Sequence, residues 1–129
     1  MPSRRDAVAP TVERVLAAVT RAGLSDEQRD NLAVALSEAL ANAAVHGNLL
    51  KAEKQVGISV GVKPGLRATI EIRDSGAGFD HDAVHDPTHP ARVLVPRGRG
   101  VFLMRRLVDE LQYNQAGNVV RLTVHSHKH

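Results

Sequence analysis

Apolar residues in the first third of the chain recur at helical spacing. Residues 8–22 place them three and four positions apart, which predicts a helix that ends at Gly23. Ser25 and Gln28 then form a capping box of the S-x-x-Q type, which predicts the start of a second helix. Its Ala- and Leu-rich pattern is expected to continue to about residue 46, with Gly47 as a left-handed C-cap.

The middle of the chain changes to the alternating pattern of strands. Apolar side chains occupy every second position in residues 56–62 and again in residues 66–72, and the Pro64-Gly65 pair between them predicts the turn of a hairpin. The hairpin is expected to end at Asp74. Residues 79–97 are rich in Pro and His without a sustained period, so they indicate a long loop that acts as a functional lid.

Helical spacing returns after this loop. Residues 100–111 predict a third helix, and residues 119–124 predict a last strand. The apolar face of the third helix would hold Val101, Met104, Leu107, Val108 and Leu111. This order of elements does not alternate as in a doubly wound fold. It indicates one α+β domain over residues 1–129, a two-layer sandwich of helices on a mostly antiparallel mixed sheet.

Composition narrows the class of protein. The 129 residues include no Cys, which excludes disulfides, thiolate metal sites and a Cys nucleophile. No apolar run approaches the roughly 18 residues of a transmembrane helix, and the N-terminus has no apolar signal-peptide core, so we expect a soluble cytoplasmic protein. The net charge of +3 is small and only 2% of the residues are aromatic, so direct nucleic-acid binding is not expected.

Three polar residues share one face of the second predicted helix. Glu38, Asn42 and His46 are four positions apart, so they drift only slowly around the helix axis. A solvated polar stripe has the same spacing. The Asn in mid-helix argues for a role of its own, because Asn is a poor helix former and its amide oxygen is a ligand.

Two glycine motifs follow on the elements that their chemistry requires. Residues 74–78, Asp-Ser-Gly-Ala-Gly, come directly after a strand, where glycines let the backbone approach a ligand closely. Residues 97–100, Arg-Gly-Arg-Gly, open a helix whose free N–H groups can hold an anion. Taken alone, the first motif is equally compatible with an ordinary turn and the second with a hinge. The second is neither a Walker A loop nor a dinucleotide-binding fingerprint.

The histidines raise the question of a metal site. His81, His85 and His89 are four positions apart, a spacing that on a helix would suit Zn²⁺ or Ni²⁺. Pro87 and Pro90 are incompatible with a regular helix there, so a specific metal site is not expected. The same holds for the tail histidines His125, His127 and His129.

The three motifs in this order resemble the N, G1 and G2 boxes of the gyrase, heat-shock-chaperone, histidine-kinase and MutL ATPases, the GHKL superfamily. The run from Leu32 to Asn48 and the run GRGVFLMRRLVDEL are similar to those of the bacterial anti-sigma-factor serine/threonine kinases. The resemblance covers roughly residues 8–124. It implies the histidine kinase-like ATPase (Bergerat) fold. The boxes would lie at about residues 36–48, at 74–78 and at 98–104, with a lid at about 79–97.

The resemblance also implies roles for individual residues. In such kinases the N-box Asn coordinates Mg²⁺ and the N-box Glu is the general base, which points to Asn42 and Glu38. The G1 Asp recognises the adenine amino group, which points to Asp74. His46 would either join the site or cap the C-terminus of its helix. The remaining residues implied to bind nucleotide are Gly76, Gly78, Arg97, Gly98, Arg99, Gly100 and Val101.

The function implied is that of an ATP- and Mg²⁺-dependent serine/threonine protein kinase. Such a kinase phosphorylates an anti-anti-sigma protein of the STAS type and holds a sigma factor inactive. Two alternatives stay open. One is a nucleotide-binding module that regulates partners without kinase activity. The other is the catalytic domain of a histidine kinase, which needs an acceptor His that is normally upstream, and no His precedes Glu38.

Two departures from the family pattern bear on these expectations. Relatives usually begin with a strand before the first helix, whereas this chain leaves little room for one, so a homodimer through that sheet edge stays open. Many relatives carry Gly-Thr before the final strand, whereas this chain has Gly117-Asn118, which would weaken a phosphate or base contact. The Pro- and His-rich lid implies an unusual closure.

Overall fold

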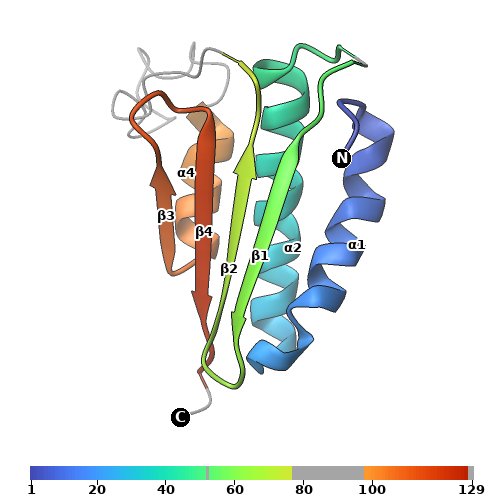
Figure 1. The fold of residues 1–129 in the computed structure, drawn as a ribbon. Helices are drawn as coiled ribbons and strands as arrows, with labels where there is room; N and C mark the ends of the chain where they lie inside the picture. Colours follow the sequence, from blue (N-terminus) through green and yellow to red (C-terminus); the bar gives the residue numbers. More distant parts are fainter. Residues whose placement is uncertain (52, 77–97, 128–129) are drawn as a thin grey trace.

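Helices cover one face of a four-stranded sheet in the computed structural model of the chain, which describes residues 1–51, 53–76 and 98–127 (Figure 1). All of the strand pairings in these ranges are antiparallel, so the predicted α+β sandwich is confirmed. The sheet has the spatial order β1-β2-β4-β3. Its strands are β1 (Gly57–Lys63), β2 (Arg67–Arg73), β3 (Glu110–Tyr113) and β4 (Val119–His125).

The first helix and the start of the second lie where local signals predict. Helix α1 (Val8–Ala18) continues into a 3-10 turn, and the chain leaves that turn at Gly23, whose φ of 75° is in the left-handed region. Helix α2 (Asp26–Ala41) starts with the predicted capping box. The Ser25 hydroxyl accepts from the Gln28 N–H at 3.1 Å, and the Gln28 side chain accepts from the Ser25 N–H at 3.0 Å.

The end of the second helix differs from the prediction. The chain does not continue as an α-helix to residue 46 but widens into a π-helical turn, Asn42–Gly47. The expected left-handed cap at Gly47 is wrong, because the left-handed residues are Leu49 and Leu50, each with a φ of 55°. Gly47 is required for a different reason, which is its close contact with the loop after β2.

The third helix is shorter than predicted. Helix α4 (Gly98–Leu107) ends before Leu111, which lies in strand β3 instead of on the helix. This strand is not predicted from the sequence pattern. It has four residues, and its apolar Leu111 happens to continue the helical spacing of the residues before it.

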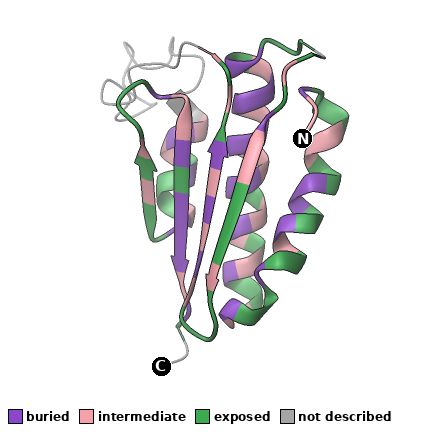
Figure 2. Ribbon diagram, in the orientation of Figure 1, coloured by how far each residue is buried: buried purple, intermediate pink, exposed green. Residues whose placement is uncertain are grey.

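The core lies between the sheet and the helices. Successive side chains of a strand point to opposite faces, and in β2 and β4 one set is buried while the other faces away from the helices (Figure 2). The buried apolar strand residues are Ala68, Ile70, Ile72, Val120, Leu122 and Val124. They pack with helix residues that include Leu32, Leu36, Leu40, Val101 and Met104.

The N-terminal residues lie beside the start of β1. Pro2 pairs with Gln55 in a single antiparallel bridge, and the Val56 N–H donates to the Met1 carbonyl at 2.8 Å. A bridge, not a full strand, therefore precedes the first helix, as the sequence predicts. None of the helices in the described ranges is both long and apolar enough to cross a membrane.

Candidate functional site

One end of the sandwich gathers the predicted motifs. Helix α2 and strand β2 both run toward this end, and α4 starts from it and runs back (Figure 1). The loop between β3 and β4 lies at the same end. Antiparallel topology thus brings together residues that are far apart in the sequence.

The end of α2 contributes Glu38 and Asn42. Both are half-buried, whereas His46 is exposed. Asn42 opens the π-helical turn, a feature that is frequent at functional sites. The Asn42 Nδ2 atom is buried and has no hydrogen-bond partner among the described residues. Leaving such a group unsatisfied costs about 1–3 kcal/mol, so this amide indicates a site that is completed by a ligand.

Asp74, directly after β2, is held against the end of α2. Its backbone N–H donates to the Asn118 carbonyl at 3.0 Å, and its Oδ1 accepts from the Gly76 N–H at 2.8 Å. A Cβ on Gly47 would overlap the Asp74 carboxylate, and a Cβ on Gly76 would lie 2.5 Å from the Gly47 carbonyl oxygen. Glycine is needed at both positions so that the backbone and this carboxylate can lie this close together.

The start of α4 packs against Glu38 and Asn42. A Cβ on Gly100 would lie 2.9 Å from Glu38 Oε2 and 3.2 Å from Asn42 Nδ2. Gly100 therefore lets the first turn of α4 approach both side chains. The N-terminus of a helix carries unpaired N–H groups and partial positive charge, so an anion bound there would also lie close to Glu38 and Asn42.

A narrow pocket lies between the end of α2, the end of β2 and the loop that joins β3 to β4. Its volume is about 10 Å³, which is room for roughly one water molecule. A group as large as a nucleotide base can therefore enter only when the lining side chains move. The pocket combines the amide of Asn42 and the carboxylate of Asp74 with apolar walls from α2, β2 and β4. Its lining residues are Ala39, Asn42, Ala43, Ile72, Asp74, Tyr113, Gly117, Asn118 and Val120.

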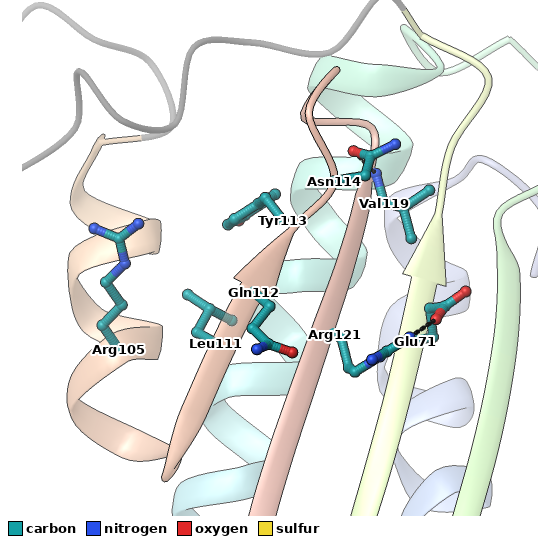
Figure 3. A pocket seen from close by; sticks show the side chains of 8 residues that line it. All are labelled: Glu71, Arg105, Leu111, Gln112, Tyr113, Asn114, Val119 and Arg121. Atoms are coloured by element: carbon teal, nitrogen blue, oxygen red, sulfur yellow. Dashed lines mark hydrogen bonds and ion pairs between the residues drawn. The ribbon is translucent and has the colours of Figure 1, made fainter.

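A wider cavity of about 560 Å³ lies beside β3 and β4 but contains none of the motif residues. Figure 3 shows Arg105 on α4 at one side of it and the Glu71–Arg121 ion pair at the other. The two arginine partners of Glu71 are more than half exposed, so this pair is a surface interaction. We take the narrow pocket as the candidate functional site because Asn42 of the first motif and Asp74 of the second both line it, and Gly100 of the third lies close to Asn42.

Not every predicted site residue lies in the part of the chain that the structure describes. Gly78 and Arg97 lie outside the described residues, as do His81, His85 and His89. Gly98 and Arg99 lie in the first turn of α4, but the structure describes no side chain for Arg99. The Val101 side chain is fully buried in the core, so only its backbone can contact a ligand.

Two asparagines at this end, Asn48 and Asn118, make contacts near Asp74 that the sequence does not predict. Asn118 Nδ2 donates to the Gly76 carbonyl at 3.2 Å, so the residue noted as a departure from the family pattern braces the loop after Asp74. Asn48 is completely buried, and its Oδ1 accepts from the Ser75 N–H at 2.7 Å. A polar residue just beyond the end of a helix is an ordinary sequence feature, so nothing in the local pattern indicated the role of Asn48.

Comparison with known families decides what this arrangement is. The profile of the histidine kinase-like ATPase domain matches residues 1–124. The chain belongs to this family. Two solved structures of histidine kinases share this fold, each with a TM-score of 0.56. The mycobacterial sensor histidine kinase MprB is 19% identical, with 78% of this chain and 74% of that chain covered. A histidine kinase domain from Erythrobacter litoralis EL346 is 20% identical, with 91% and 60% covered.

Curated relatives of this ATPase domain are named serine-protein kinase RsbW. The Bacillus subtilis protein is 31% identical over 111 residues, which cover 81% of this chain and 69% of the relative. The Oceanobacillus iheyensis protein is 30% identical over 106 residues, which cover 78% of this chain and 66% of the relative. The chain is thus a kinase-like ATPase domain whose sequence resembles serine-protein kinases.

The residues at the site fit the ATP and Mg²⁺ that this family implies. Mg²⁺ usually takes one or two protein oxygens and completes its shell with phosphate and water, so Asn42 Oδ1 suffices as a protein ligand. The unpaired Nδ2 of the same amide is a hydrogen-bond donor, so it suits a phosphate oxygen and not the metal. The described residues contain no cluster of three His, Cys, Asp or Glu side chains that could hold a metal ion without a nucleotide.

Proposed function

We propose that this chain is an ATP- and Mg²⁺-dependent serine/threonine protein kinase and anti-sigma factor. Its substrate would be an anti-anti-sigma protein of the STAS type, and its second partner a sigma factor that it holds inactive. The observation that supports this most is the contact of Glu38 and Asn42 with the first turn of α4 at Gly100. The proposed general base, Glu38, and the proposed metal-binding amide, Asn42, thus lie beside a helix N-terminus, which is suited to bind phosphate.

The proposed roles follow from the family resemblance and, for the described residues, from their places at this end of the sandwich. Asp74 accepts a hydrogen bond from the adenine amino group, and the backbone N–H groups of Gly98, Gly100 and Val101 contact phosphate. Arg97 and Arg99 neutralise phosphate charge, and Gly76 and Gly78 let the loop close on the base and ribose. Asn42 Oδ1 would hold Mg²⁺, which when bound neutralises charge on the phosphates.

Glu38 is the proposed general base. The substrate hydroxyl oxygen forms a bond to the γ-phosphorus while the bond between that phosphorus and the β–γ bridging oxygen breaks. The hydroxyl proton passes to a carboxylate oxygen of Glu38, and ADP leaves with the bridging oxygen. The half-buried position of Glu38 beside Gly100 supports this role, because phosphate is proposed to bind at the first turn of α4.

A nucleotide-dependent binding module without kinase activity is the second candidate. Asn118 favours it, because it stands where many relatives carry Thr and its side chain donates to the Gly76 carbonyl at 3.2 Å. The proposal of a histidine kinase is weaker. The solved histidine kinases share the fold, but the likeness at about 20% identity carries no activity with it.

Phosphotransfer separates the first two candidates. Purified protein, radiolabelled ATP, Mg²⁺ and a STAS-domain protein should give serine phosphorylation, and Glu38→Gln should lower the rate by at least about 100-fold, as loss of a general base does. Glu27→Gln is the matched control, because Glu27 is an exposed carboxylate at the opposite end of the same helix. Partner binding without any phosphotransfer would favour the binding module instead. An unchanged rate in Glu38→Gln would remove Glu38 from the mechanism.

Location and assembly are part of the proposal. A cytoplasmic kinase is expected from its proposed partners, and fractionation of cells that express a tagged full-length protein tests this. A homodimer through the edge of the sheet at β1 remains an expectation, and sedimentation equilibrium would measure it.

A further inference from the structure

A buried asparagine links three segments at the nucleotide end of the molecule. Asn48 has no exposed surface, and its side chain makes three hydrogen bonds. Its Oδ1 accepts from the Ser75 N–H at 2.7 Å, and its Nδ2 donates to Gln55 O at 3.2 Å and to Ser3 Oγ at 3.0 Å. One amide therefore holds the loop after Asp74, the segment before β1 and the N-terminal residues together.

The N-terminal side of this network is itself well fixed. Ser3 has no exposed surface, and its hydroxyl donates to the Lys54 carbonyl at 2.5 Å. The Met1 amino group donates to the Val56 carbonyl at 2.9 Å. Residues 1–3 thus lie along residues 54–56, near the N label beside the start of β1 in Figure 1. The hydrogen bonds form a continuous chain from this segment through Asn48 to Ser75, and such chains reinforce one another.

The backbone beyond Asn48 is strained. Leu49 and Leu50 both have a φ of 55°, which is uncommon for residues other than glycine, Asn and Asp. They are 63% and 37% exposed, so burial of their side chains does not hold this conformation. Strain of this kind persists where the surrounding structure fixes the backbone. Here the Asn48 N–H donates to the Ala43 carbonyl at 2.8 Å and the Leu50 N–H to the Ala44 carbonyl at 2.9 Å.

We propose that Asn48 is a positioning residue for adenine recognition, and that through it residues 1–3 are part of the nucleotide site. The amide that Asn48 holds belongs to the residue after Asp74, and the next amide, that of Gly76, holds Asp74 Oδ1 at 2.8 Å. When residues 1–3 leave residues 54–56, Asn48 Nδ2 loses its bond to Ser3. The Asn48 side chain is then less firmly held, and the loop after Asp74 loses a fixed acceptor for the Ser75 N–H. The affinity for ATP then falls. This inference rests on the proposed function in that Asp74 recognises the base.

Ser3→Ala tests the inference at the far end of the network. It removes the hydroxyl that joins Asn48 to Lys54 and leaves Asn48 and Asp74 in place. Ser126→Ala is the matched control, since Ser126 is 1% exposed and its hydroxyl donates to the Gly23 carbonyl at 2.9 Å. Ser126 lies past the end of β4, at the opposite end of the sheet from the site. Each variant therefore loses one buried hydroxyl of the same kind.

Two measurements are made on the full chain. Calorimetry with Mg-ATP and Mg-GTP should show that Ser3→Ala raises the Kd for ATP about three- to tenfold, the effect of one hydrogen bond, and brings the two nucleotides closer in affinity. Amide exchange by NMR without nucleotide should show faster exchange at Ser75 in Ser3→Ala. Ser126→Ala should match wild type in both measurements. Asn48→Ala, if it folds, should exceed Ser3→Ala in both.

The two readouts separate the inference from the function on which it rests. If Ser3→Ala and Ser126→Ala behave alike at Ser75, the inference is overturned even when ATP binds. If wild type binds no ATP, the proposed function fails, and faster Ser75 exchange in Ser3→Ala alone still supports the link from residues 1–3 to this loop. If Ser3 only stabilised the fold, Ser3→Ala would lower the stability to a similar extent as Ser126→Ala and would leave the preference for adenine unchanged.

Discussion

The contact between Gly47 and Asp74 makes a sharp prediction for Gly47→Ala. A Cβ at this position would lie 2.5 Å from Asp74 Oδ1 and closer still to the other two carboxyl atoms. The closest of these atoms, Asp74 Cγ, would lie at 2.2 Å, and ordinary contact begins at about 3.4 Å, so the carboxylate or the π-helical turn must move by about 1.2 Å. Gly47 is buried, so the added methyl group cannot turn toward solvent.

The cost can be worked from what holds Asp74 in place. Moving the carboxylate breaks its 2.8 Å hydrogen bond from the Gly76 N–H, and a hydrogen bond to a charged group contributes about 1.5–3 kcal/mol. The same movement displaces the acceptor for adenine. We therefore expect Gly47→Ala to raise the Kd for Mg-ATP about 10- to 100-fold and to lower the free energy of unfolding by about 1–3 kcal/mol.

Calorimetry and thermal unfolding check this prediction against Gly61→Ala. Gly61 is exposed in β1, and the nearest atom to its Cβ would be the Thr69 carbonyl oxygen at 4.0 Å. Alanine there should leave the Kd unchanged and the stability unchanged or slightly higher. A folded Gly47→Ala protein that binds ATP within twofold of wild type would refute the reasoning, because Asp74 would then not need its observed position.

Two further predictions concern other contacts. Gly100→Ala places a methyl group 2.9 Å from Glu38 Oε2, and we expect the phosphotransfer rate to fall about tenfold with a smaller change in the Kd for ATP, as measured by single-turnover assays; a fall in affinity alone would contradict the placement of Glu38. Hydrogen bonds from Arg73 and Arg121 hold the pKa of Glu71 below its ordinary value of 4.5. An acid with a lowered pKa stabilises the fold above its ordinary value and loses that contribution as the pH falls through the lower one. Urea unfolding should therefore show Glu71→Gln less stable by about 0.5–1 kcal/mol at pH 7, with the difference shrinking below pH 4.5, and an equal difference at all pH values would contradict it.

Local signals predicted much of the fold. The capping box of α2, the stop at Gly23 and the hairpin of β1 and β2 depend on residues within a few positions of one another, so the sequence shows them directly. The motifs at Glu38 and Asp74 were likewise found on the expected elements.

Features that depend on distant contacts were not predicted. Asn48 and the Ser75 N–H are 27 residues apart, and no local pattern shows that they meet. Gly47 looked like a helix cap because a glycine after a helix usually is one, whereas here the approach of Asp74 requires it. Strand β3 was not predicted because it has only four residues, and its apolar Leu111 continues the helical spacing of the preceding helix. The sequence therefore shows no separate alternating pattern for it.

Binding of Mg-ATP to wild type and to Asp74→Asn tests the central claim most directly. The account predicts micromolar binding to wild type by calorimetry, with most of the affinity lost in Asp74→Asn while the protein stays folded. Absence of binding to wild type, or equal affinity in both proteins, would contradict the assignment of this end of the sandwich as a nucleotide site.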